Sequence, residues 1–109
     1  ARPDSGFILD SLGWALYRLG RYEESVDHIE RAAELMPVDP VVTDHLGDIY
    51  WAVGRLREAK FQWNRALSFN PEDKDATRIR RKLKVGLDAV LAEEGSEPLK
   101  VAQDGRNGG

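Results

Sequence analysis

Two matching stretches, 34 positions apart, decide the fold. Residues 12–21 read LGWALYRLGR, and residues 46–55 read LGDIYWAVGR. When residues 6–39 are aligned with residues 40–73 without a gap, ten of the 34 positions are identical. The identical pairs are Asp10/Asp44, Leu12/Leu46, Gly13/Gly47, Gly20/Gly54, Arg21/Arg55, Glu24/Glu58, Arg31/Arg65, Ala32/Ala66, Pro37/Pro71 and Asp39/Asp73. Self-similarity at such a period is typical of an architecture in which each unit stacks on the next.

Apolar residues between these marks recur with the spacing of a helix face. In the first unit Ile8, Leu12 and Ala15 share one such face, and the later positions continue the same spacing. The pattern predicts four helices, over residues 7–19, 22–35, 41–53 and 56–69. Pro37 and Pro71 end the second helix of each unit. The connecting turns are short, so neighbouring helices are expected to run antiparallel.

Glycines recur where a helical repeat needs them. Gly13 and Gly47 lie inside helical patterns, where glycine costs about 1 kcal/mol relative to alanine. A costly residue at a fixed period indicates close approach of two helices, where a Cβ would clash. Gly20 and Gly54 follow the first helix of each unit, where a left-handed C-terminal cap fits.

The spacing and residue types of both units resemble the tetratricopeptide repeat signature. The matching residues are Leu12, Gly13, Leu16, Gly20, Tyr22, Ala32 and Pro37, then Leu46, Gly47, Tyr50, Gly54, Ala59, Trp63, Ala66 and Pro71. The resemblance covers about 68 of 109 residues. Leu9 and Thr43 stand at the family's tryptophan position and Ser25 at its first small position, which are mild departures. The resemblance implies an all-α fold of antiparallel helix-turn-helix repeats.

A finer resemblance concerns residues 10–18, DSLGWALYR, which are similar to the last repeats of long bacterial tetratricopeptide proteins. Some of those proteins are envelope lipoproteins that act as adaptors for proteases. The chain starts at Ala1 without a methionine, and we interpret it as a segment of a longer protein. The compartment therefore stays open: cytoplasmic, or periplasmic if the parent protein carries a signal peptide or lipid anchor.

The repeats are expected to end at a capping helix. Residues 74–95 contain an apolar stripe that includes Ala76, Ile79 and Leu83, but a third copy in phase would need Leu-Gly at Arg80-Arg81. One side of this helix can cover the last repeat while the charged side faces water. The predicted organisation is a lead-in (1–5), repeat one (6–39), repeat two (40–73), the capping helix (74–95) and a disordered tail (96–109).

Composition and motifs argue against an enzyme. The chain has no cysteine, no nucleophile motif, no phosphate-binding loop and no metal-binding spacing. His28 and His45 are predicted to lie on different helices, so we expect no catalytic residue, cofactor or metal. The net charge is −3, and the basic run near Arg80 is balanced because residues 72–94 hold six Lys/Arg and six Asp/Glu. We therefore expect no nucleic acid partner, and no apolar run is long enough for a membrane span.

The resemblance implies a partner-binding concave face along the first helix of each repeat. Carried onto this chain, the face consists of Phe7, Asp10, Ser11, Trp14, Tyr17, Arg18, Asp44, His45, Asp48 and Trp51, with Arg78 and Lys82 from the capping helix. Chaperone-binding members of the family present Lys, Asn and Arg to a peptide carboxylate. Here Asp10, Asp44 and Asp48 occupy the floor, and they would repel that carboxylate. We expect instead a protein or peptide partner of basic and apolar character.

Two alternatives remain open at this point. The chain could be the structural end of a longer superhelix whose binding site lies upstream, since such repeats usually need about three units for stability. Its N-terminal edge, with Ile8 and Leu12 uncovered, could also form a weak homodimer. Trp14 and Trp51 could be packed between helices or face a ligand.

Overall fold

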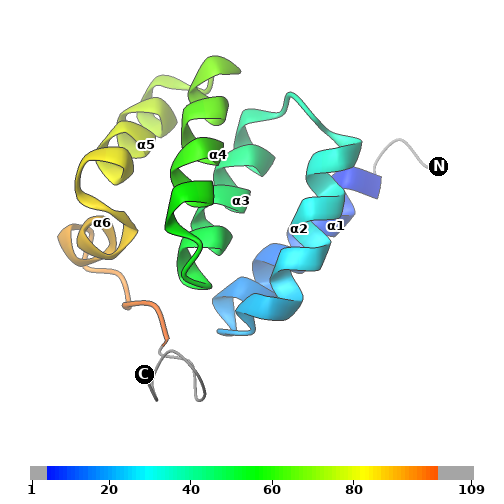
Figure 1. The fold of residues 1–109 in the computed structure, drawn as a ribbon, viewed down its shortest axis with the longest axis horizontal. Helices are drawn as coiled ribbons and strands as arrows, with labels where there is room; N and C mark the ends of the chain where they lie inside the picture. The colour runs from blue at the N-terminus through cyan, green and yellow to red at the C-terminus, as the bar shows by residue number, and fades with distance from the viewer. Residues whose placement is uncertain (1–4, 101–109) are drawn as a thin grey trace.

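The regular structure of residues 5–100, the part that the computed structural model describes, is entirely helical (Figure 1). The helices are α1 (Ser5–Arg18), α2 (Tyr22–Leu35), α3 (Pro40–Ala52), α4 (Leu56–Ser68), α5 (Asp73–Val85) and α6 (Leu87–Glu93). The hairpins α1/α2 and α3/α4 stand side by side, and α5 and α6 continue the row beyond α4 (Figure 1). This confirms the predicted all-α helical repeat fold. None of these helices has the length and apolar character that crossing a membrane requires.

The turn inside each hairpin depends on a glycine. Gly20 and Gly54 have φ of 82° and 87°, in the left-handed region that favours glycine. Each glycine amide donates to the carbonyl three residues back, and the following Arg21 or Arg55 amide donates to the carbonyl five residues back, at 2.8–3.0 Å. These bonds satisfy the last carbonyls of α1 and α3 and turn the chain into the next helix.

The second helix of each repeat begins with the same ion pair. Arg21 binds both carboxylate oxygens of Glu24, and Arg55 binds both of Glu58 in the same way. The start of α3 is capped differently, because the Asp39 side chain accepts from the amides of the second and third residues that follow it, at 2.9 and 3.0 Å. The recurring Arg-x-x-Glu pattern therefore has a local structural role.

Two helices approach each other closely at Gly13 and at Gly47, the glycines that recur inside the first helix of each repeat. The indole of Trp63 fills the place that a Cβ on Gly47 would need, and the end of the Ile29 side chain does the same at Gly13. Trp63 and Ile29 are fully buried members of the hydrophobic core. Ser25 is also buried, and its hydroxyl donates to the Gly13 carbonyl at 2.7 Å, so the polar departure at this position stabilises the first hairpin.

The single capping helix expected over residues 74–95 is in fact two helices. Gly86 separates α5 from α6 with φ 89° and ψ 157°, a conformation open to glycine but not to other residues. The Trp51 ring lies 2.9 Å from the place where a Cβ on Gly86 would stand. The break turns α6 back beneath α5 and buries Leu87 and Val90.

The expected disorder from residue 96 onward is not what the structure shows for residues 96–100. Leu99 packs against the hydrophobic core, and the Lys100 amide donates to the Tyr22 hydroxyl at 2.7 Å. One apolar side chain and one hydrogen bond therefore hold in place a segment that its composition predicted to be disordered. Residues 101–109 of that predicted tail, and residues 1–4 of the predicted lead-in, lie outside the described part of the chain.

Candidate functional site

The surface along α1, α3 and α5 contains two adjoining hollows, which together we call the groove. The narrower hollow, of about 160 Å³, is lined by Trp14, Pro40, Val41, Asp44, His45, Asp48, Pro71, Asp75, Arg78 and Ile79. The wider hollow, of about 440 Å³, is lined by Trp14, Tyr17, Arg18, Tyr22, Asp48, Arg78, Leu91 and residues 96–100. The two share Trp14, Asp48 and Arg78, so they form one continuous depression.

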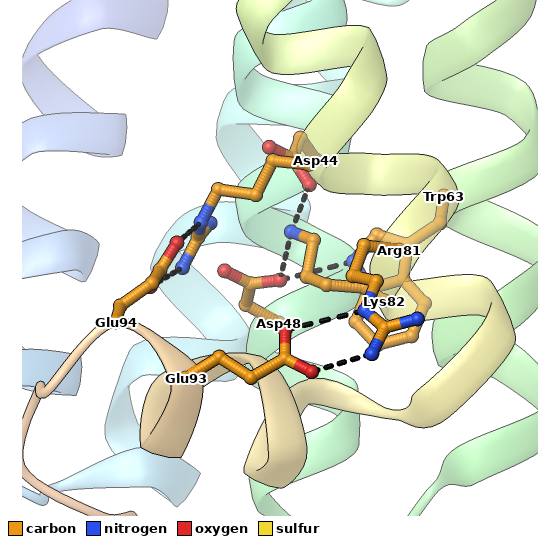
Figure 2. A network of polar contacts seen from close by, with 8 residues as sticks. Asp44, Asp48, Trp63, Arg81, Lys82, Glu93 and Glu94 are labelled. Carbon is orange, nitrogen blue, oxygen red and sulfur yellow. Dashed lines mark hydrogen bonds and ion pairs between the residues drawn. The ribbon is translucent and has the colours of Figure 1, made fainter.

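A buried lysine lies beneath the groove between the second repeat and α5. The Lys82 ammonium contacts Asp44 at 2.5 Å and Asp48 at 2.6 Å, as Figure 2 shows. The indole N–H of Trp63 donates to the same Asp48 oxygen at 3.0 Å. Lys82 is 0% exposed and Asp48 is 2% exposed. Both were predicted to face a partner, but their charges are used inside the protein, where each compensates the other.

The electrostatic balance of this cluster is incomplete. One ammonium group faces two carboxylates, so the three side chains together keep a negative charge. Burial raises the pKa of Asp44, and the neighbouring Asp48 carboxylate adds to the rise, while Lys82 and His45 oppose it. Asp44 is the more accessible acid, with a side chain 18% exposed. Arg78 also lines the narrower hollow, but it is paired with Glu94, so the carboxylates of Asp44 and Asp75 there favour a further positive charge.

A second cluster joins the two repeats on the floor of the groove. The Nδ1 atom of His45 lies 2.9 and 3.1 Å from the two carboxylate oxygens of Asp10. Trp14 stacks on the His45 ring at 3.9 Å between centroids and on Tyr17 at 4.4 Å. Asp10 is 8% exposed and lines neither hollow, so the structure places this predicted partner-binding acid in an internal contact. Trp14 is half-buried: one side packs on His45 while the indole still lines both hollows.

Trp51 belongs to the junction with α6 rather than to the groove lining. Its indole N–H donates to Asp88 at 2.9 Å, and its ring stacks on Trp63 at 5.5 Å between centroids. Asp88 carried no signal in the sequence, because it was expected in the middle of one long helix. The break at Gly86 brings it to Trp51.

Among the other predicted residues, Tyr17, Arg18 and Arg78 line the wider hollow, whereas Phe7 and Ser11 lie exposed on α1 outside both linings. Burial raises the pKa of the Tyr17 hydroxyl, which therefore stays neutral as a hydrogen-bonding group. Arg78 binds both carboxylate oxygens of Glu94, at 2.6 and 3.1 Å, which ties α5 to the end of α6. The groove thus presents aromatic surface at its α1 end and carboxylates at its α3/α5 end.

Residues 96–100 are the part of the site that the sequence did not predict. They line the wider hollow together with Tyr22 and Leu91, which are not among the residues that the sequence places on the concave face. Charge also links α6 to α5, because Arg81 of α5 binds Glu93 of α6 (Figure 2). Long-range pairs of this kind have no spacing that a sequence pattern could reveal.

Within residues 5–100 no group of three or more His, Cys, Asp and Glu side chains is placed to hold a metal ion. The groups that converge on the groove are aromatic rings, carboxylates and basic side chains: Arg78, which is paired with Glu94, and Arg18 and Lys100, which line the wider hollow. Such a set can recognise apolar and charged side chains by packing and charge.

Comparison with known proteins identifies the family of the two repeats. Two family models described as tetratricopeptide repeat match residues 6–37 and residues 44–73. Over 78 residues the chain is 37% identical to the TPR repeat-containing protein PA4667 of Pseudomonas aeruginosa, a match that takes in 71% of this chain. The chain spans only 13% of the length of that curated relative. No solved structure matches.

Proposed function

This chain belongs to the tetratricopeptide repeat family, and from that premise we propose that its groove binds an extended segment of a partner protein. Repeats of this family generally act as protein-interaction modules, and the family typically provides scaffolds rather than enzymes. The observation that carries the proposal is the continuous groove between Trp14, Asp48 and Arg78, with aromatic surface at one end and carboxylates at the other.

The chemistry of the groove favours a partner with apolar and basic side chains. Trp14 and Tyr17 offer flat apolar surface to a large aliphatic or aromatic side chain. Asp44 and Asp75 line the narrower hollow, where Lys82 leaves one carboxylate charge uncompensated. A lysine or arginine of the partner would restore that balance. The narrower hollow is therefore the proposed position of the basic residue, and the wider hollow that of the apolar one.

Charge reversal at Asp75 tests the proposal. Short random peptides displayed on phage are selected on the native chain, and selected sequences are expected to combine a large apolar residue with Lys or Arg. Asp75→Lys should weaken their binding about fivefold, because one charge contact becomes a repulsion. The measurement is the dissociation constant by fluorescence polarisation.

Asp73→Lys is the matched control for that variant. Asp73 also lies in the first turn of α5, so both substitutions remove an acidic side chain that interacts favourably with the helix N-terminus. Asp73, however, is exposed and does not line the groove. Its dissociation constant should stay within about twofold of the native value. Selection of acidic peptides, or equal weakening by the two variants, would contradict the proposed binding mode.

A second candidate function is that the outer face of α1 receives the last helix of a preceding repeat. Ile8 and Leu12 are each 48% exposed. Their counterparts one period later, Val42 and Leu46, are 1% and 4% exposed, and their helix α3 has α2 of the preceding repeat packed against it. The internal symmetry thus supports a helix of α2 type as the missing cover, and the chain would then close a longer array.

Duplication of the first repeat tests this candidate. A chain with a second copy of residues 6–39 placed before the first should gain about 2 kcal/mol in the free energy of unfolding, because Ile8 and Leu12 of the original copy become buried. The control is the same duplicated chain in which Ile8 and Leu12 of the original copy are changed to Asp. Urea denaturation measures the stability of both duplicated chains. Equal midpoints for the two duplicated chains would argue against docking on this face.

A further inference from the structure

Residues 96–100, which Glu94 and Gly95 separate from the end of α6, form one wall of the wider hollow of the groove; we call them the C-terminal strap. The strap leaves α6 at Gly95, whose φ of 72° turns the chain, and the Ser96 amide donates to the Leu91 carbonyl at 2.9 Å. It then runs toward the turn between α1 and α2 (orange in Figure 1). All five residues contribute to the lining of the wider hollow.

The strap contacts the groove in the manner of an extended ligand. It has no helical or strand structure. Its far end donates a backbone amide to the Tyr22 hydroxyl at 2.7 Å, and the Leu99 side chain is partly buried against the core cluster that Trp14 and Tyr17 also contact. A main-chain hydrogen bond combined with one inserted apolar side chain is how extended peptides bind to preformed surfaces. Leu99 thus covers core surface at the edge of the wider hollow, beside the place proposed for the partner's apolar residue.

The helix before the strap is held firmly, whereas the strap itself is held lightly. Arg78 pairs with Glu94 and Arg81 with Glu93, so the end of α6 is tied to α5 by two bidentate ion pairs (Figure 2). Beyond Gly95 the side chains of Ser96, Glu97 and Lys100 are exposed, and Leu99 is the half-buried one. A segment with few buried contacts opens locally at low cost while its anchor stays in place.

We propose that the C-terminal strap is an intramolecular cover on the edge of the groove, and that a partner displaces it to reach the surface beneath Leu99 and the Tyr22 hydroxyl. This inference rests on the proposed partner-binding function of the groove and adds its regulation. It also narrows the partner's chemistry to an extended segment with an aliphatic residue that can replace Leu99. The apparent affinity for such a segment is reduced by the fraction of molecules in which the strap is closed.

The test is a titration of full-length chains with a synthetic peptide of residues 96–109, followed by amide chemical shifts. Leu99→Asp should release the strap, because it places a carboxylate against the core. This variant is expected to bind the added peptide through Tyr17 and Tyr22 at least about fivefold more tightly than the native chain, whose own strap competes at a high effective concentration. A peptide that carries the same Leu99→Asp change should bind to neither chain.

Leu56→Asp is the matched control, since Leu56 is an exposed leucine on α4, far along the chain from the strap. It should bind the peptide as weakly as the native chain does. Equal affinity of the native and Leu99→Asp chains would overturn the inference, and so would an absence of shifts in both. Neither result depends on the phage-selected peptides that bind the groove. A failure of the inference about the strap can therefore be told apart from a failure of the Asp75→Lys test.

Discussion

Replacing Lys82 with methionine is expected to lower the free energy of unfolding by about 3–5 kcal/mol. Methionine keeps the apolar stem of the side chain but removes the ammonium group that lies 2.5 Å from Asp44 and 2.6 Å from Asp48. Two carboxylates would then remain close together in a site with little access to water. Urea denaturation followed by circular dichroism measures the loss.

Lys84→Met is the matched control, because Lys84 lies on the same helix but is exposed. Its effect should stay within about 0.5 kcal/mol. Adding Asp48→Asn to Lys82→Met should recover part of the stability, since one of the two uncompensated charges is then gone. If Lys82→Met costs no more than Lys84→Met, the ion pairs do not hold α5 on the second repeat.

The loss from Lys82→Met should shrink in acid. Burial and the nearby Asp48 carboxylate already raise the pKa of Asp44, and removing Lys82 takes away the first of the groups that oppose the rise. A carboxyl whose pKa is higher in the folded than in the unfolded state favours folding once it is protonated, and this advantage disappears as the pH rises through the folded-state pKa. The difference between the variant and the native chain should therefore be smaller at about pH 5 than at about pH 7.

Replacing Trp63 with alanine is expected to cost about 3–5 kcal/mol, the usual range for removing a buried aromatic side chain. Trp63 is fully buried, packs against Gly47 and stacks on Trp51, and its ring lies 5.0 Å from the Lys82 ammonium. The substitution therefore opens a cavity and also removes the indole N–H that donates to Asp48. Thermal and urea unfolding of the variant measure both contributions together.

Trp63→Phe separates these contributions. Phenylalanine retains most of the apolar volume but has no N–H group, so its loss should be about 1–3 kcal/mol, the cost of leaving a buried acceptor without that partner. Phe61→Ala on the same helix serves as the control, because Phe61 is 62% exposed and should contribute little. A loss for Trp63→Ala close to that of Phe61→Ala would mean that the second repeat does not depend on this core residue.

The sequence predicted the repeats well because local features determine them. Gly20 and Gly54 mark the turns, the helix-face period marks the helices, and the paired Gly13 and Gly47 mark the close contacts; these features agree with one another. The four repeat helices begin and end within two residues of the predicted positions. Even the departure at Ser25 has a local explanation, since its hydroxyl bonds to the facing helix.

The sequence predicted the site less well because its groups pair across long separations. Lys82 and Asp48 were each assigned to a surface on the basis of register, but a register cannot show that opposite charges from two helices meet and leave the surface together. Gly86 falls inside the single capping helix that the sequence predicts over residues 74–95. The break there sets the direction of α6, and with it the course of the strap.

Burial is uneven along the stack, and this has a consequence for dynamics. The buried residues of α1 are Gly6, Asp10 and Gly13, none of which has a large apolar side chain, whereas α3 is buried along most of its length. Amide hydrogen exchange in α1 should therefore occur through partial opening, well before global unfolding exposes α3. The aromatic end of the groove belongs to this more labile hairpin. A bound partner would slow exchange there most, because part of its binding free energy would go into ordering the first repeat.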